Sequence, residues 1–207
     1  MDSNHMMETA RESLHNTARE IDRVSSYLDE TQFAQVVTAI MQCRTKVLVC
    51  GIGTSGAAAR KIAHSLACVE IPALYLNPGD AAHGASGMIQ AEDVIILLSK
   101  GGQSSELLTL IPIIKQRGGL IIAVTEQLQS TLARSADILL QLNIERESDQ
   151  AGVLATASTL VTIATFDAVC SVLMRLKGFT GERFLSIHPG GAVGKKLMEK
   201  QGVADDR

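Results

Sequence analysis

The feature that most constrains the fold of this 207-residue chain is an alternation of short apolar runs with helical patterns. Five runs rich in Val, Ile and Leu are typical of buried parallel strands, at 46–50, 73–77, 94–99, 120–125 and 138–142. Helical spacing is found between them at about 55–68, 104–117 and 129–135, with a longer loop at 80–89. This order predicts an α/β fold, an open five-stranded parallel sheet with helices on both faces.

Further helices are expected on either side of this alternating region, at about 31–43 and 156–177, with a short one near the C-terminus. Residues 1–6 are predicted to form a disordered leader. From Met7 to Leu28 apolar residues recur every three or four positions and form a narrow seam on a charged helix. The seam can cover the chain's own domain or pack against a partner subunit, and both interpretations stay open at this point.

Composition limits the class of protein. Hydrophobic residues make up 46% of the chain and aromatic residues only 3%, so the core is aliphatic, and a single domain at 7–207 is expected. The net charge of −3 argues against nucleic-acid binding through a basic face. We find no apolar run of membrane-spanning length and no cysteine or histidine spacing typical of a metal site. These features favour a cytoplasmic protein with free thiols, no membrane or nucleic-acid partner, no metal and no cofactor.

The stretch after the third predicted strand has the strongest features of a ligand site. Ser99-Lys-Gly-Gly-Gln-Ser-Ser105 joins an apolar run to a helical pattern. The first N–H groups of a helix have no intrahelical partner and favour an anion, and hydroxyls suit the oxygens of a phosphate. An ordinary turn with a serine cap is the alternative. Three hydroxyls and two glycines in seven residues favour a phosphate site made by Ser99, Gly102, Gln103, Ser104 and Ser105.

A second glycine-rich loop, Gly51-Ile-Gly-Thr-Ser-Gly56, follows the first predicted strand and matches GxGxxG. The dinucleotide-binding form of this motif needs an acidic residue at the end of the next strand. The first acidic residue there is Asp80, already in the loop, so a nicotinamide cofactor is not expected. Thr54 and Ser55 instead add hydroxyls to the same edge of the sheet, which favours a sugar-phosphate site.

Two histidines and two glutamates are also candidates for this site. His83 lies in a loop at the predicted carboxyl edge, and His188 precedes Pro189 in a glycine-flanked turn that restricts its backbone. Glu106 is ordinary as a first-turn helix carboxylate and Glu147 as a surface charge. On their own, these two carboxylates do not indicate a function.

Together these motifs resemble the sugar isomerase (SIS) domain over about residues 10–200. The resemblance is in GxGxSG after the first strand, the His-Gly loop, S-x-x-G-x-S-S-E after the third strand and HPGGAxGKKL in the tail. Within that family the chain is similar to arabinose-5-phosphate isomerases, which interconvert arabinose 5-phosphate and ribulose 5-phosphate. Those enzymes usually continue into two cystathionine-β-synthase-type domains. This chain stops at Arg207, so the resemblance implies a catalytic domain without that pair.

The resemblance also implies roles for individual residues. Its catalytic groups fall on His188, Glu106, Glu147 and His83, and its phosphate contacts on Ser99, Ser104, Ser105, Thr156 and Ser158. Two positions depart from the family pattern. A lysine of the first glycine loop is replaced by Thr54, and the usual SNSGES reads SKGGQS, which introduces Lys100. This exchange either preserves the positive charge at the phosphate or marks a different substrate.

An aldose–ketose isomerase needs a base that moves a proton between C1 and C2 and donors that polarise the carbonyl oxygen. A cis-enediol path needs no redox cofactor. His188 is expected to be the leading base, with the other three catalytic candidates polarising, orienting or opening the sugar ring. A homo-oligomer, in particular a tetramer with active sites at subunit boundaries, is also expected. A phosphosugar sensor without catalytic activity and another isomerase, such as 6-phospho-3-hexuloisomerase, are the alternatives.

Overall fold

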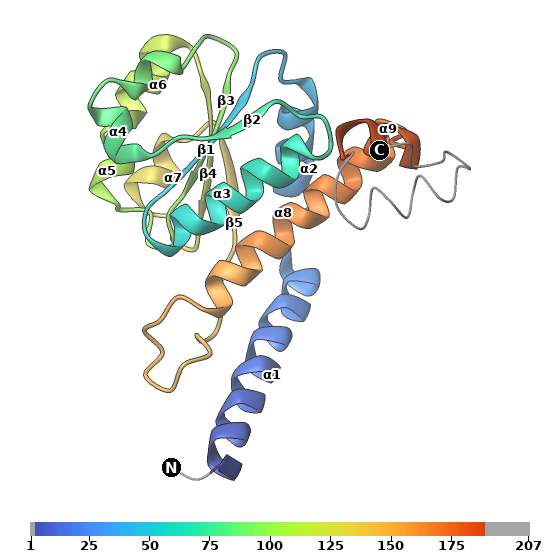
Figure 1. Ribbon diagram of the computed structural model, residues 1–207. Coiled ribbons are helices and arrows are strands. Elements are labelled where there is room, and N and C mark those ends of the chain that lie inside the picture. Colours follow the sequence, from blue (N-terminus) through green and yellow to red (C-terminus); the bar gives the residue numbers. More distant parts are fainter. Residues whose placement is uncertain (1–2, 189–207) are drawn as a thin grey trace.

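The computed structural model describes residues 3–188 and has the predicted α/β architecture (Figure 1). All strand pairs are parallel, and the order across the five-stranded sheet is β2-β1-β3-β4-β5. The strands are β1 (Val47–Gly51), β2 (Ala73–Tyr75), β3 (Val94–Leu98), β4 (Leu120–Thr125) and β5 (Ile138–Gln141). The predicted fold class is therefore confirmed. Because all five strands run in one direction, the loops that follow them meet at one edge of the sheet.

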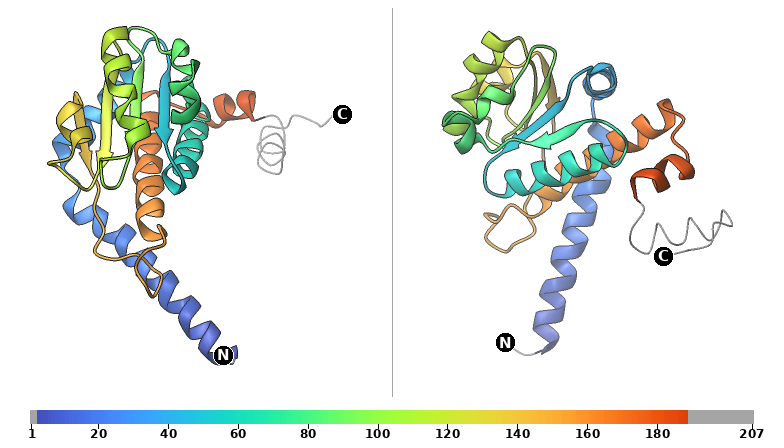
Figure 2. Two further views of the ribbon diagram at one scale, coloured as in Figure 1. Left: turned by 90° about the vertical axis from the view of Figure 1, so that its left-hand side faces the viewer. Right: turned by 45° about the horizontal axis from the view of Figure 1, so that its top comes forward.

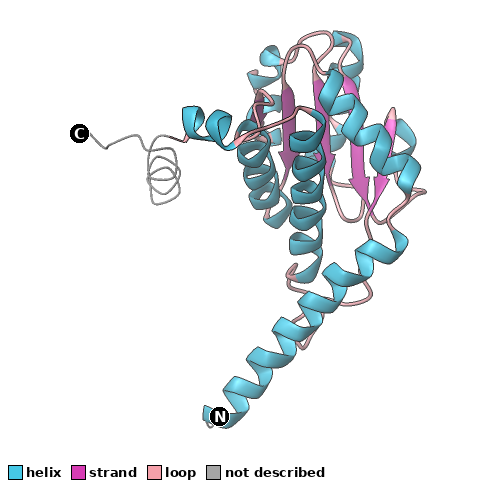
Figure 3. Cartoon of the chain, turned by 90° about the vertical axis from the view of Figure 1, so that its right-hand side faces the viewer, coloured by secondary structure: helices cyan, strands magenta, loops and turns pink. Residues whose placement is uncertain are grey.

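Helices cover both faces of the sheet (Figure 3). Alternate strand residues face opposite sides: Val47 and Val49 of β1 belong to one apolar cluster, and Leu48 belongs to the other. The first cluster includes residues of α2 (Glu30–Gln42), α3 (Thr54–Ala67) and α8 (Ala157–Leu176). The second includes residues of α4 (Pro78–Ala82), α5 (Ser105–Leu108), α6 (Leu110–Arg117) and α7 (Thr131–Ser135). The sheet is thus the buried middle layer.

The helix predicted at 104–117 is divided into α5 and α6. Pro112 has no N–H to donate to the carbonyl of Leu108, and its ring crowds that carbonyl. The division falls at Thr109, directly after Leu108. The loop at 80–89 likewise contains the end of α4 and a 3-10 helix, Ala85–Met88.

Helix α1 (Ser3–Tyr27) begins four residues earlier than predicted, so most of the expected disordered leader is helical. The helix already includes Met6 and Met7, and both side chains are exposed. The N-terminal half of α1 projects away from the sheet domain in each view (Figure 2). The helix buries only Asn16, Glu20 and Val24, so its attachment to the domain is mainly polar.

Helix α8 is long and apolar enough to cross a membrane by length and composition, contrary to the sequence-based expectation. In the fold it packs beside α3 and α1 (Figure 1), and Val161, Phe166 and Leu173 are buried in the core. Packing in the core therefore accounts for part of its apolar character, whereas Leu160 and Leu176 are exposed.

The described chain ends at His188, after α9 (Gly181–Ile187). The remainder of the HPGG motif and the predicted last helix lie outside the described residues. All four cysteines (Cys43, Cys50, Cys68 and Cys170) are free, as predicted.

Candidate functional site

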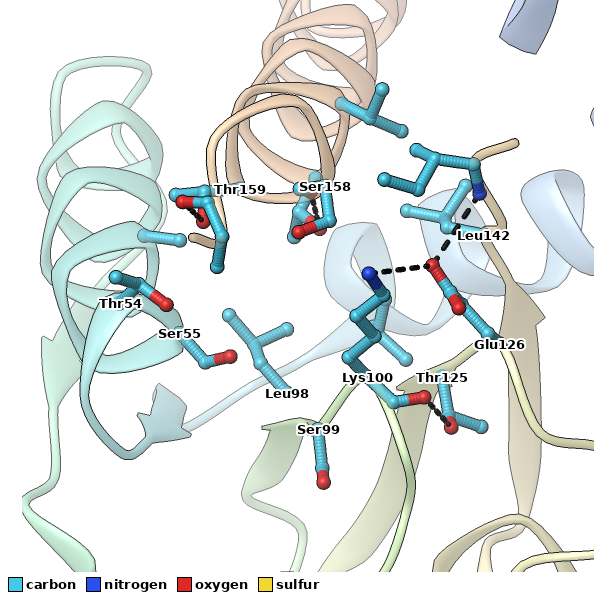
Figure 4. Close-up of a pocket in the computed structure, with 16 residues that line it drawn as sticks. Thr54, Ser55, Leu98, Ser99, Lys100, Thr125, Glu126, Leu142, Ser158 and Thr159 are labelled. Atoms are coloured by element: carbon cyan, nitrogen blue, oxygen red, sulfur yellow. Dashed lines mark hydrogen bonds and ion pairs between the residues drawn. The ribbon is translucent and has the colours of Figure 1, made fainter. Parts of the chain in front are cut away.

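A cavity of about 110 Å³ opens at the carboxyl edge of the sheet, beside the ends of β3 and β4 and the first turns of α3 and α8 (Figure 4). Its polar lining comes from Thr54, Ser55, Ser99, Lys100, Thr125, Glu126, Ser158, Thr159 and Thr162. Four residues predicted to contact the phosphate, Thr54, Ser55, Ser99 and Ser158, therefore line one cavity. The Ser99 hydroxyl points away from the other three (Figure 4).

The first glycine loop brings α3 to the cavity without a capping side chain. Gly53 occupies the N-cap position with φ of 58°, which favours glycine, and no side-chain hydrogen bond caps the helix. A Cβ atom on Gly51 would lie 2.5 Å from the carbonyl oxygen of Ser55, so this turn requires glycine. The glycines therefore set the close turn that places the hydroxyls of Thr54 and Ser55 at the cavity.

The second glycine loop folds around Ser99, which is only 6% exposed. The Ser99 hydroxyl accepts a hydrogen bond from the N–H of Gly102 at 3.1 Å and lies 2.9 Å from the Ser104 hydroxyl. Gly102 has φ of 63°, and a Cβ there would collide with Ser130. Ser104 occupies the N-cap position of α5, but its side chain makes no capping hydrogen bond. The serine-cap alternative for this loop therefore has no support at Ser104.

Lys100 extends from this loop between two carboxylates. Its Nζ donates to Glu147 Oε1 at 2.7 Å and lies 3.8 Å from Glu126 Oε1. Glu147 is 4% exposed, whereas the Lys100 side chain is 44% exposed. Of these three charged side chains, that of Lys100 is therefore the most accessible to a ligand.

Glu147 also caps the N-terminus of α8. Its Oε2 accepts from the N–H groups of Thr156 and Ser158 at 3.0 and 3.1 Å, and the hydroxyls of both residues donate to the same carboxylate. Of these two predicted phosphate contacts, only Ser158 lines the cavity. In this structure both residues bind the glutamate.

The two glutamates differ in pKa. Burial acts to raise the pKa of Glu147, but hydrogen bonds from Lys100 and Ser158 outweigh it and hold the pKa below its ordinary value. Burial raises the pKa of Glu126 above its ordinary value, although Lys100 acts in the opposite direction. Glu147 is therefore a firmly ionised carboxylate, and Glu126 accepts a proton more readily.

None of the four predicted catalytic residues, all of which lie in the described part of the chain, lines this cavity within one chain. Glu147 is hydrogen-bonded to two residues that do, Lys100 and Ser158. Glu106 and His83 are both exposed, and Glu106 accepts a hydrogen bond from Ser105. His188 lies at the opposite end of α3, where its Nε2 is 3.9 Å from Cys68 Sγ and its ring stacks on Phe184 at 4.3 Å. The predicted set of four is thus divided between separate places in the chain, and its roles stay predictions.

No role is predicted for Glu126 or Thr125 from the sequence. Both could have been predicted from the rule that ligands bind at the carboxyl ends of parallel strands, because they lie at the end of β4. Thr159 and Thr162 were missed because only the α8 packing turns them toward the cavity.

Comparisons with known proteins agree with the fold and the motifs. The SIS domain matches residues 40–171. The arabinose 5-phosphate isomerase KdsD of Yersinia pestis is 39% identical over 85% of this chain and 53% of its own length. The arabinose 5-phosphate isomerase KpsF of Escherichia coli is 35% identical over 97% of this chain and 63% of its own length. The chain therefore spans between half and two thirds of these relatives.

Two solved structures are similar over their whole length. A Listeria monocytogenes protein, a candidate sugar-phosphate isomerase, has a TM-score of 0.90 at 43% identity and covers 92% of this chain. An E. coli CFT073 protein solved in complex with arabinose 5-phosphate has a TM-score of 0.87 at 31% identity and covers 91% of this chain. In both cases this chain covers 100% of the other protein's chain.

Proposed function

The chain belongs to the SIS domain family, and on that premise we propose that it is an aldose–ketose isomerase of sugar phosphates, interconverting arabinose 5-phosphate and ribulose 5-phosphate. The observation that supports this most directly is the cavity at the carboxyl edge, which is lined by Lys100 and several hydroxyls. The buried carboxylate of Glu147 is hydrogen-bonded to two of the lining residues, Lys100 and Ser158. A related structure of the same fold was solved with arabinose 5-phosphate. The proposed compartment is the cytoplasm.

In this proposal, the phosphate binds at the second glycine loop. Ser99, Ser104 and Ser105 supply hydroxyls, Gly102 and Gln103 supply the turn, and Lys100 supplies the positive charge. Lys100 thereby replaces the lysine that the family resemblance leads one to expect at Thr54. Its ammonium group is partly exposed, so it can turn from Glu147 toward a dianionic phosphate without a change in the backbone.

The proposed chemistry is a proton transfer between C1 and C2 through a cis-enediol. Glu147 is held beside the lining residues Lys100 and Ser158 by five hydrogen bonds, and we assign it a direct role as a base or as an acceptor that orients the sugar hydroxyls. His188 keeps its role as a base only if a second copy of the chain brings it to this cavity. Glu106 and His83 would polarise the carbonyl or open the ring from the same boundary.

This proposal therefore includes a homo-oligomer, specifically a tetramer with sites at subunit boundaries. Met7, Leu14 and Ile21 of α1 are exposed, and they repeat every seven residues along the projecting helix. Val153 and Leu154, in the loop before α8, are also exposed. Exposed apolar side chains on neighbouring elements suit contacts between copies of the chain.

A phosphosugar sensor is the second candidate, and one observation favours it. The lysine of the first loop is absent, and Lys100 forms ion pairs with two carboxylates. A protein of this kind would bind a sugar phosphate without moving its protons.

Turnover of a panel of pentose and hexose phosphates in deuterated water tests the proposal. We expect arabinose 5-phosphate and ribulose 5-phosphate to interconvert with incorporation of deuterium at C1 or C2. Binding without turnover or exchange would favour the sensor. Exchange with a hexulose phosphate alone would favour the hexuloisomerase.

A further inference from the structure

The segment that carries Glu147 is held by the N-terminal helix. Residues 143–148 follow β5 and have neither helical nor strand structure. Backbone N–H and C=O groups in such a segment need partners when they are covered. Here many of these partners are side chains from one face of α1, which we call the polar face: Asn16, Thr17, Glu20, Arg23 and Tyr27. All but Thr17 bind backbone groups, and Thr17 contacts the Ser148 hydroxyl.

The contacts nearest to Glu147 come from the middle of α1. Asn16 Nδ2 donates to the carbonyl oxygen of Arg146 at 3.3 Å and to Ser148 Oγ at 3.2 Å. The hydroxyls of Thr17 and Ser148 are 2.6 Å apart. The residues immediately before and after Glu147 are thus both bound to α1.

The end of the segment closer to β5 is bound in the same way. Glu20 Oε2 accepts from the N–H of Glu145 at 3.1 Å. Arg23 and Tyr27 both donate to the carbonyl oxygen of Asn143, at 2.9 and 2.6 Å, and the N–H of Asn143 donates to the Tyr27 hydroxyl. Four side chains of α1 therefore bind the backbone at 143–148 from one side, and Thr17 adds a contact with the Ser148 side chain.

The polar face lies in the C-terminal half of α1, which packs on the domain, and its central residues are buried although they are polar. Asn16 is 3% exposed and Glu20 is 1% exposed. Burying a carboxylate is costly unless it is paired, and Glu20 has Arg23 at 3.2 Å. Apolar side chains at these positions would attach α1 at lower cost, but they could not bind backbone N–H and C=O groups. The polar face therefore acts on the position of the segment and not only on the docking of the helix.

We propose that Asn16, Thr17 and Glu20 are positioning residues for the isomerase reaction. They hold residues 145–148 so that the Glu147 carboxylate stays between Lys100 and the N-terminus of α8. This inference rests on the proposed function, because Glu147 is useful at this place only if a substrate binds there. It also assigns α1 a role that its apolar seam does not indicate.

The test uses Asn16→Ala and Glu20→Ala, with Glu20→Gln as the conservative variant that keeps an acceptor for the N–H of Glu145. Asp22→Ala is the matched control, because Asp22 is an exposed carboxylate of the same helix. Thr17→Val removes only the hydroxyl contact with Ser148 and serves if an alanine variant does not fold. Amide hydrogen exchange at residues 143–148 measures how firmly α1 fixes this segment, and it needs no substrate.

We expect exchange at 143–148 to increase in the alanine variants, to recover largely in Glu20→Gln and to stay unchanged in Asp22→Ala. Turnover of arabinose 5-phosphate should fall roughly ten- to hundredfold with little change in KM, since a small displacement of a catalytic group has effects of this size. Each variant is then combined with Glu147→Gln. A residue that acts through Glu147 should cause little further loss in that background.

The outcomes separate the two proposals. If the wild type turns over no phosphosugar, the proposed function fails. The exchange data then show only whether α1 keeps residues 143–148 in place. If turnover is normal in the variants, or if their losses multiply with that of Glu147→Gln, the polar face only docks the helix and the inference is wrong.

Discussion

The two ends of helix α3 both hold residues that the sequence marks as functional, but their surroundings differ. At the N-terminal end, Thr54 and Ser55 face an open cavity with several hydroxyls and two charged side chains, those of Lys100 and Glu126. At the C-terminal end, Cys68 contacts His188, whose ring packs flat against Phe184. The first end is polar and accessible, whereas the imidazole at the second has a buried Nδ1 without a hydrogen-bond partner among the described residues.

Helix α3 is too long for one substrate to contact both of its ends. Fourteen residues at 1.5 Å each separate the two ends by about 20 Å, which is more than a pentose phosphate can span. One substrate molecule therefore cannot contact both ends of α3 in the same chain. The proposed site lies at the N-terminal end, and residues at the C-terminal end could contribute to such a site only on another copy of the chain. The predictions below test this division.

The largest effect is expected at the cavity. Glu147→Gln keeps the shape of the side chain but removes its charge and its ability to take up a proton. We expect kcat for arabinose 5-phosphate to fall by roughly 10²–10⁴-fold, the usual range for a general base. Steady-state kinetics measure this effect. Glu145→Gln is the matched control, because the Glu145 side chain is 69% exposed, and it should retain activity.

A Glu147→Gln protein with normal turnover would show that the buried glutamate only caps α8. In that case, loss of the cap should lower the stability of the folded protein instead. The folded state lowers the pKa of Glu147, so its ionisation stabilises the protein above pH 4.5, and this stabilisation is lost as the pH falls through the folded value.

The second prediction concerns the other end of α3. His188→Asn should lower turnover by a similar factor, roughly 10²–10⁴-fold, with nearly normal affinity, provided that the imidazole serves the cavity of a second copy. Light scattering should show an oligomer. Hetero-oligomers of His188→Asn and Glu147→Gln chains, purified with two different tags, should regain part of the activity, because some sites then contain both native residues.

If these mixed assemblies stay inactive while each homo-oligomer is well folded, the histidine and the glutamate do not share a site between copies. A monomer at micromolar concentration would exclude the arrangement altogether. His188 would then be a packing residue beside Phe184 and Cys68.

This comparison also shows which parts of the molecule can be predicted from sequence. The sheet and the loops at its carboxyl edge follow from local patterns, so Ser55 and Ser99 could be assigned to one site. Pro112 could have indicated the break between α5 and α6. These features depend on nearby residues or on a general rule for parallel sheets.

The rest depends on contacts between distant parts of the chain. Glu147 and Asn16 look like surface residues in the sequence, yet both are buried because α1 and α8 close over the segment at 143–148. The path from α8 to His188 places that residue at the far end of α3, which no local pattern specifies. Lys100 could be recognised as unusual, but its position between two glutamates could not.

The third prediction concerns Lys100. Lys100→Met should weaken phosphosugar binding roughly ten- to hundredfold, since a hydrogen bond to a charged group contributes about 1.5–3 kcal/mol. Lys100→Arg should retain most of the affinity. Isothermal titration with arabinose 5-phosphate measures both. Equal affinity in all three proteins would mean that the lysine serves only to neutralise Glu147.

A smaller effect is expected for Ser104→Ala. Loss of one hydrogen bond to the phosphate should weaken binding by about 1–2 kcal/mol, or roughly 5–30-fold. The melting temperature should change little, because the Ser104 side chain makes no capping hydrogen bond. A variant that binds normally and melts earlier would restore the helix-cap interpretation.

The smallest effect is expected for Glu126→Gln, and it tests the charge balance of the cavity end of α3. Burial raises the pKa of Glu126, so the folded state holds its proton more tightly than the unfolded state. As the pH rises from 4.5 through the raised folded value, ionisation therefore lowers the stability of the wild type. Glutamine carries no such cost. Near neutral pH, we expect Glu126→Gln to melt about 1–2 °C higher than the wild type, the shift for a fraction of a kcal/mol in a domain of this size.

Below pH 4.5 the melting curves of Glu126→Gln and wild type should converge. Glu147→Gln should instead melt lower than the wild type, with the largest difference near neutral pH. Thermal melts from pH 4 to pH 8 measure this. A Glu126→Gln protein that is less stable at neutral pH would show that the ion pair with Lys100 outweighs the burial of the carboxylate.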